Sequence, residues 1–101
     1  MRIAIAQLNP TVGDLTGNRK LVEEAAARAE AAGVEIALFP EMVLTGYPPM
    51  DLLERHGFVR DQLAELDALA PLSRNIDLAL GAVVPVQGGS SKRLANAAVL
   101  L

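Results

Sequence analysis

The order of apolar and polar positions divides the chain into alternating strand-like and helix-like segments. Residues 3–8 are apolar on both faces, which predicts a strand in the middle of a parallel or covered sheet. Residues 11–18 hold a cluster of turn residues, and a helix with one apolar face is predicted from there to about Ala32. Residues 34–39 predict a second strand. Strand, helix and strand within about forty residues form a βαβ unit, so these two strands are expected to be parallel.

The next segment predicts two helical stretches separated by a glycine. Asp51 and Glu54 are spaced as in a capping box, so a helical turn is expected to begin at Asp51. Gly57 is expected to interrupt it. A longer helix is predicted over residues 58–74, and Pro71 should kink or end this helix because proline has no backbone N–H donor.

The last segment predicts a β-hairpin. Residues 76–86 and 94–101 are apolar runs that predict a third strand and an antiparallel fourth strand, joined by a flexible loop at residues 87–93. Pro85 marks an irregular or edge position in the third strand. The chain finishes inside an apolar run, which natural domains seldom do because such an edge aggregates. We therefore expect residues 1–101 to be the amino-terminal portion of a longer α/β domain.

One carboxylate stands where the second apolar run stops. Glu41 follows Pro40 directly and has apolar residues on both sides. Open α/β folds place their chemistry just past the carboxyl ends of parallel strands. Two interpretations fit this position equally well: Glu41 is a general base, or it is a loop carboxylate that accepts backbone N–H bonds.

The other candidate residues have structural explanations beside their functional ones. Tyr47 follows the turn at Gly46, where it either lines the same pocket as Glu41 or packs its ring in a stiff Tyr-Pro-Pro turn. Five further polar residues are expected to be structural: Asp14 and Asp51 as turn or helix caps, His56 and Lys20 on the solvated surface, and Lys92 in a loop.

Composition excludes several kinds of site. The sequence has no cysteine and one histidine, so this chain alone supplies no thiol nucleophile, thiolate metal site or histidine metal cluster. A net charge of -3 and an aromatic content of 3% argue against binding nucleic acid. No apolar run approaches the roughly 20 residues of a membrane helix. Gly88-Gly89 lacks the Lys-Ser/Thr pair of a phosphate-binding loop. We expect a cytoplasmic protein that binds no nucleic acid, membrane or metal.

A short motif at Glu41 resembles the first signature of a known superfamily. Leu38-Phe39-Pro40-Glu41, followed by Leu44-Thr45-Gly46-Tyr47, is similar to the nitrilase, or carbon–nitrogen hydrolase, superfamily. The resemblance implies an α-β-β-α sandwich fold. Residues 1–101 would form roughly its first third, a partial domain truncated at its carboxyl end.

Two longer stretches narrow the resemblance. Residues 7–14 and 44–53 are similar to the glutaminase domain of glutamine-dependent NAD(+) synthetases. Residues 95–100 resemble the next strand of that family, where Tyr-Asn or Phe-Asn is common. Here Ala95 precedes Asn96, which is a small departure.

The resemblance implies a Glu-Lys-Cys triad that hydrolyses glutamine. Glu41 matches the Glu, the general base that takes the thiol proton of the Cys. The thiolate would attack the side-chain amide of glutamine to give a thioester and ammonia, and the Lys would stabilise the tetrahedral intermediate. Neither Lys20 nor Lys92 matches the Lys, and the chain has no Cys, so the chain alone is expected to be inactive. The resemblance also suggests that Tyr47 lies near the glutamine pocket.

The larger enzyme implied by the resemblance has further ligands. Its ammonia would pass to a carboxyl-terminal synthetase domain that uses ATP and Mg²⁺ to convert deamido-NAD to NAD, and the enzyme would be a homo-oligomer. No cofactor is expected in residues 1–101 themselves. Two alternatives remain open. The first is that the chain is part of a stand-alone nitrilase-type amidase, although residues 7–14 and 47–53 argue against it. The second is that the chain is a flavodoxin-like binding module complete in itself.

Overall fold

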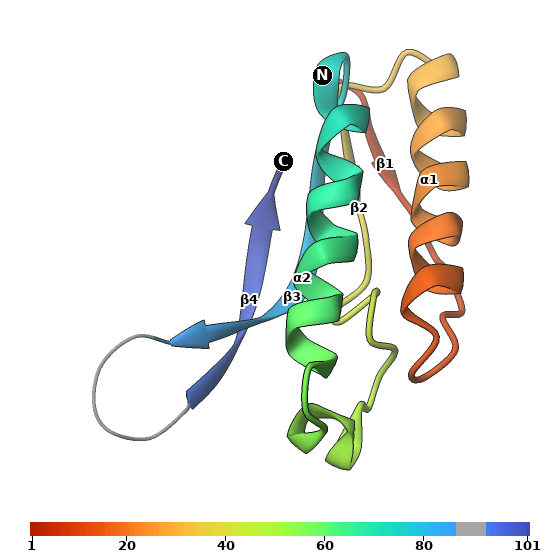
Figure 1. The fold of residues 1–101 in the computed structure, drawn as a ribbon. Helices are drawn as coiled ribbons and strands as arrows, with labels where there is room; N and C mark the ends of the chain where they lie inside the picture. Colours follow the sequence, from red (N-terminus) through yellow and green to blue (C-terminus); the bar gives the residue numbers. More distant parts are fainter. Residues whose placement is uncertain (87–92) are drawn as a thin grey trace.

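The computed structural model describes residues 1–86 and 93–101 and forms one sheet with helices on one side (Figure 1). The elements are β1 (Ile3–Ile5), α1 (Leu15–Ala31), β2 (Ile36–Leu38), the 3-10 helix η1 (Met50–Glu54), α2 (Phe58–Leu69), the 3-10 helix η2 (Ala70–Arg74), β3 (Asp77–Val86) and β4 (Arg93–Leu100). The strand order is β1-β2-β3-β4; the first three strands are parallel and β4 is antiparallel to β3. The predicted α/β class, βαβ unit and hairpin are therefore confirmed. The predicted loop at 87–93 falls almost wholly outside the described residues.

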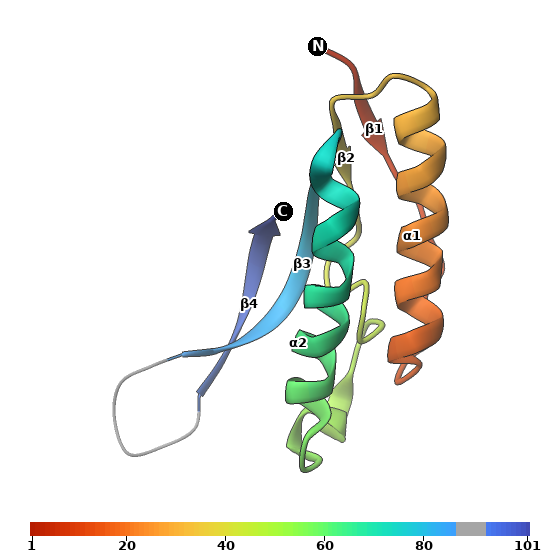
Figure 2. The same cartoon turned by 45° about the horizontal axis from the view of Figure 1, so that its top comes forward.

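Helices α1 and α2 lie side by side over the same face of the sheet, as two views show (Figures 1 and 2). The apolar stripe of α1 is buried there, and so are the residues of the sheet that face the helices. The main members of this core are Val22, Ala26, Ala29, Ala37, Leu66, Leu69, Leu78, Leu80 and Ala82. The small alanines Ala26 and Ala29 on α1 permit close approach to the strands.

Polar side chains join the two helices along their outer side. Arg19 of α1 forms ion pairs with Glu23 one turn further along and with Glu65 of α2. The hydrogen bond to Glu65 is the main cause that raises the pKa of Arg19 above its ordinary value. Thr16 adds a hydroxyl hydrogen bond of 3.0 Å to the same Glu65 carboxylate. These contacts fix α1 and α2 relative to one another over the sheet.

Helix α1 begins inside the stretch that the sequence predicted to be a turn. Asp14 caps it by accepting a 3.1 Å hydrogen bond from the backbone N–H of Gly17, which confirms the predicted capping role. Gly17 lies in the first turn of the helix. A glycine is required there because a Cβ at this position would stand 2.1 Å from the Asp14 carboxylate. Gly33, with φ +74°, follows the C-cap Ala32 and ends the helix as predicted.

The prediction that Asp51 caps a helix is wrong. The 3-10 helix η1 begins at Met50 with Pro49 at its N-cap, and no side chain caps it. Asp51 already lies inside the first turn, past the position from which a capping side chain reaches the free N–H groups. Gly57, with φ +81°, does separate η1 from α2. Helix α2 gives way to η2 at Ala70, so the break predicted from Pro71 is confirmed.

The first two strands are shorter than predicted. Pairing continues slightly past their ends, through the bonds from Ala6 N to Leu38 O at 2.8 Å and from Phe39 N to Ala79 O at 2.9 Å. Beyond these bonds the backbone leaves the sheet for the loops that carry Pro10 and Pro40, which cannot donate to a ladder. Strand β1 also lies at an edge of the sheet and not in its middle.

The face of the sheet opposite the helices is apolar and open within the described part of the chain. The register aligns Ile5, Leu38, Ala79 and Leu100 across all strands, so their side chains share this face. Three of them are exposed: Ile5 to 74%, Leu38 to 37% and Leu100 to 67%. We call the three exposed residues Ile5, Leu38 and Leu100 the open row. Among the described residues, no helix is long and apolar enough to cross a membrane.

Candidate active site

Glu41 lies in the turn that follows β2, beside the open face of the sheet. A shallow cavity of about 420 Å³ adjoins it, lined by Leu38, Phe39, Glu41, Ala79, Leu80, Gly81, Asn96, Ala97 and Ala98. The lining is apolar except for Glu41 and Asn96. The Asn96 side chain donates a hydrogen bond from Nδ2 to Oε1 of Glu41, across a sequence separation of 55 residues. The cavity thus combines residues from the end of β2 and the turn after it with residues from within β3 and β4.

Gly81 allows the Glu41 turn to lie directly on β3. A Cβ built on Gly81 would stand 2.8 Å from the backbone N of Met42 and 2.9 Å from Cα of Glu41. Both of those atoms belong to the backbone, so the added Cβ could be accommodated only by moving the backbone of the turn or of β3. The absence of a side chain at Gly81 is therefore a structural requirement of the site.

The turn after Glu41 is anchored in the core by Asn18. Asn18 is 1% exposed, and its amide donates to the carbonyls of Thr11 and Leu44, both at 2.8 Å. Its Oδ1 accepts from Thr11 N at 2.8 Å. One buried side chain of α1 thereby joins two loops, the one before α1 and the one that carries Glu41.

The end of the same turn contacts the loop before α1 a second time. Gly13 N donates to Thr45 O at 2.9 Å, and the Thr45 hydroxyl bonds the carbonyl of Gly46 at 2.9 Å. Gly46 has φ +78°, and a Cβ there would stand 2.6 Å from Cα of Val12. The backbone past Glu41 is thus packed on both sides, while Glu41 itself remains exposed.

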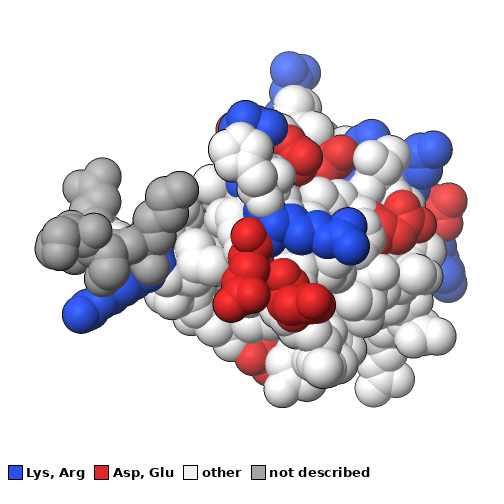
Figure 3. Space-filling view, turned by 60° about the horizontal axis from the view of Figure 1, so that its bottom comes forward, with Lys and Arg blue, Asp and Glu red and all other residues white. Residues whose placement is uncertain are grey.

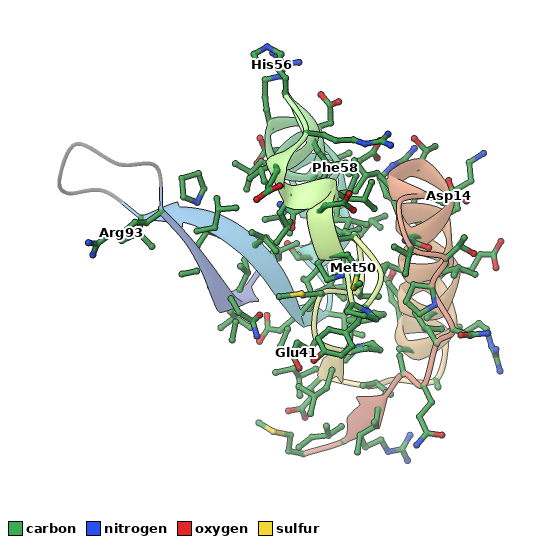
Figure 4. The ribbon with its side chains drawn as sticks, turned by 90° about the horizontal axis from the view of Figure 1, so that it is seen from below. Asp14, Glu41, Met50, His56, Phe58 and Arg93 are labelled. Carbon is green, nitrogen blue, oxygen red and sulfur yellow. The ribbon has the colours of Figure 1, made fainter. Side chains whose placement is uncertain are left out.

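The other predicted candidates lie away from this cavity. Tyr47 is 64% exposed and is not among the described residues that line it, so its role near the substrate stays a prediction. Asp14 and His56 stand well apart from Glu41 in the view from below (Figure 4). His56 and Lys20 are exposed, as predicted. Lys92 and Gly88-Gly89 fall outside the described residues.

Reasoning from the residues alone missed Asn96 as part of the site. Its only signal was the resemblance of residues 95–100 to a family strand, since an asparagine on an exposed strand is otherwise unremarkable. Gly81 and Asn18 were missed as well. A glycine inside a strand does signal a close backbone approach, and that signal could have been used for Gly81.

The site offers one carboxylate with one oxygen engaged by a neutral amide. Such a group can accept a proton from a nearby acid. In residues 1–86 and 93–101 no group of three His, Cys, Asp or Glu side chains could hold a metal. The face shown in Figure 3 carries Lys and Arg interspersed with Asp and Glu and separated by uncharged surface, which does not suit a nucleic-acid backbone.

The fold and the site define the class of protein. The carbon-nitrogen hydrolase family model matches residues 2–101, and the chain belongs to that family. The curated relatives it matches include glutamine-dependent NAD(+) synthetases. The protein from Synechocystis is 41% identical over 103 residues, covering 98% of this chain and 18% of that protein. The protein from Thermotoga maritima is 45% identical over 76 residues, covering 75% of this chain and 13% of that protein.

Solved structures show the same likeness. A glutamine-dependent NAD(+) synthetase from Cytophaga hutchinsonii superimposes with a TM-score of 0.89 at 28% identity, over 100% of this chain and 17% of that one. The synthetase from Acinetobacter baumannii, in complex with adenosine diphosphate, gives 0.86 at 25% identity, over 98% of this chain and 18% of that one. An amidase from Nesterenkonia sp. gives 0.79 at 27% identity, over 97% of this chain and 37% of that one. These likenesses confirm the predicted family and nitrilase-type fold, and they favour it over a flavodoxin-like module.

Proposed function

We propose that Glu41 is the general base of glutamine hydrolysis in a glutamine-dependent NAD(+) synthetase. The observation that carries the proposal is the placement of Glu41 at the carboxyl end of β2, beside a cavity on the open face. The glutamine-dependent NAD(+) synthetase from Synechocystis, which matches 98% of this chain, supports the choice of substrate. A carboxylate in this position can take a proton from a thiol that approaches over the sheet.

The chemistry needs two groups that this chain lacks. The sequence has no cysteine, and neither Lys20 nor Lys92 matches the family lysine, so the nucleophilic thiol and the lysine that stabilises the tetrahedral intermediate would come from polypeptide outside residues 1–101. The chain spans 18% and 13% of the two relatives described above, which leaves ample sequence for both. Residues 1–101 alone are therefore expected to be inactive.

Loss of the thiol proton to Glu41 makes the thiolate, which attacks the side-chain amide of glutamine. The tetrahedral intermediate collapses to a thioester and expels ammonia, which takes with it the proton held by Glu41, and water then hydrolyses the thioester to glutamate and restores the thiol. Tyr47 is proposed to lie near the glutamine once the site is complete. The ammonia would serve a second domain that uses ATP and Mg²⁺ to amidate deamido-NAD, in a cytoplasmic homo-oligomer.

A stand-alone amidase is the second candidate, because the Nesterenkonia amidase superimposes over 97% of this chain. Variants of that amidase have a glutamate replaced, and one holds the acetamide moiety of fluoroacetamide at its active-site cysteine. A synthetase converts deamido-NAD to NAD with glutamine as nitrogen donor, whereas a stand-alone amidase releases ammonia without ATP. Measuring NAD formation separates the two candidates.

The test is Glu41→Gln in the full-length protein that contains this sequence. Glutamine-driven NAD synthesis should fall by at least about 100-fold, since general-base catalysis is worth about 10²–10⁴ in rate. Synthesis driven by added ammonia should stay within about twofold of wild type. The matched control is Glu24→Gln, an exposed carboxylate on α1, which should change neither rate. Equal loss of both activities in Glu41→Gln would make Glu41 structural.

A further inference from the structure

We propose that Asn96 is the positioning residue of Glu41, and that its amide holds Oε1 so that Oε2 is the oxygen that takes the proton. The inference rests on the proposed general-base role of Glu41 and adds to it a residue that acts through Glu41. It is carried by the hydrogen bond from Asn96 Nδ2 to Glu41 Oε1 and by the presence of both side chains in the lining of the cavity.

The hairpin brings Asn96 to the site. Asn96 pairs with Val83 in the register of β3 and β4 and shares its face of the sheet with Ala98 and Leu100. This is the open face, where the Glu41 turn lies on Gly81. The small residues around the pair leave the carboxylate accessible.

An asparagine suits this role chemically. Its amide donates to a carboxylate without carrying charge and without titrating, so it holds Glu41 but does not compete for the proton. A hydrogen bond to an ionised acceptor belongs to the stronger kind. Glu41 is exposed and has a flexible side chain, and a single donor restricts the orientations that the carboxylate can adopt.

The competing explanation is that the bond merely joins β4 to the turn. The chain contains a matched pair for comparison. Asn75 Nδ2 donates to Glu30 Oε1 at 2.8 Å, also between exposed side chains and across a sequence separation of 45 residues, but away from the cavity. A purely structural asparagine–glutamate bond should behave alike at both places.

The experiment compares Asn96→Leu, Asn96→Asp and the control Asn75→Leu in the full-length protein. For Asn96→Leu, kcat for glutamine should fall about 10- to 100-fold, the cost of misplacing a catalytic group, with KM for glutamine within about threefold. Ammonia-driven synthesis and the activity of Asn75→Leu should match wild type.

Asn96→Asp keeps the shape of the side chain and replaces the donor with a second carboxylate. It should lose more glutamine-driven activity at neutral pH than Asn96→Leu, and it decides the question if the leucine variant fails to fold. A kcat for glutamine within about twofold of wild type in either folded Asn96 variant overturns the proposal. So does a loss of glutamine-driven activity in Asn75→Leu equal to that in Asn96→Leu, or a parallel loss of ammonia-driven synthesis in the Asn96 variants. If Glu41→Gln itself retains glutamine-driven synthesis, the proposed function fails instead.

Discussion

Truncating Asn18 to alanine should destabilise the chain strongly, because this side chain makes three hydrogen bonds from a buried position. Asn18 is 1% exposed and bonds Thr11 N, Thr11 O and Leu44 O, each at 2.8 Å. Alanine removes all of these bonds. The two loops that Asn18 joins would then be held by fewer contacts, among them the bond from Gly13 N to Thr45 O.

The magnitude follows from how far water can replace each bond. Thr11 is exposed, so its N–H and C=O can bond water again, and each lost bond there costs about 0.5 kcal/mol. Leu44 is 0% exposed, so its carbonyl would be left unpaired at a cost of about 1–3 kcal/mol. The sum is a loss of about 2–4 kcal/mol in the free energy of unfolding, a large share of the 5–15 kcal/mol typical of a domain.

Urea unfolding followed by far-ultraviolet circular dichroism measures this loss. With a slope of about 1–3 kcal/mol per molar urea, the midpoint for Asn18→Ala should fall by about 0.7–4 M. Asn18→Asp should lose at least as much, since it places a carboxylate against the Leu44 carbonyl. Asn75→Ala removes one exposed hydrogen bond and should stay within about 0.5 kcal/mol of wild type. A midpoint for Asn18→Ala no lower than that of Asn75→Ala would refute the assignment of a structural role to Asn18.

Two further substitutions test contacts on β3. Gln62 is 0% exposed and bonds both Val83 O at 2.9 Å and Val83 N at 2.8 Å. Gln62→Leu should therefore lower the free energy of unfolding, measured with urea, by about 2–4 kcal/mol. The control Gln7→Leu, at an exposed position, should lower it by less than about 0.5 kcal/mol. Gly81→Ala should push the Glu41 turn off the strand and lower glutamine-driven kcat of the full-length protein by at least about 10-fold, with ammonia-driven synthesis retained. Wild-type kinetics in Gly81→Ala would show that the turn tolerates the added methyl.

The elements that follow from local patterns were predictable. The apolar runs at 34–39 and 76–86 and the amphipathic stretch between Leu15 and Ala32 each carry their own periodicity, so the βαβ unit and hairpin were visible in the sequence. The residues at which the helices and strands begin and end were less predictable. Gly17 resembles a turn residue, and only the position of the Asp14 carboxylate explains why a glycine belongs in the first turn of α1.

Buried polar residues escaped prediction for a physical reason. Asn18 lies in the predicted turn cluster and Gln62 is a polar residue within a predicted helix, so an apolar pattern marks neither of them as part of the core. Their partners, Leu44 and Val83, lie 26 and 21 residues further along the chain. The residues that neighbour Asn18 and Gln62 in the sequence do not indicate that a backbone carbonyl or N–H from another element will need a hydrogen-bond partner at these positions.

In the candidate site, too, local features were predictable from the sequence and tertiary contacts were not. Glu41 was predictable because a carboxylate directly after an apolar run marks the end of a strand. Its contact with Asn96 depends on the register of β3 with β4, which is a tertiary property. The role of Asp51 was predicted wrongly because a capping-box spacing occurs there without the backbone geometry that would use it.

The open row has a consequence for how stability varies with temperature. Ile5 and Leu100 are largely in water when the chain is folded and Leu38 is 37% exposed, so unfolding exposes less additional apolar area at these positions than at covered ones. The heat-capacity change of unfolding grows with newly exposed apolar area, and this row adds less to it than a covered row would. The stability of the chain should therefore vary less steeply with temperature than that of an equally long domain whose sheet is covered on both faces. Polypeptide that comes to lie on the row would steepen that dependence and, for the same reason, increase the sensitivity of unfolding to urea.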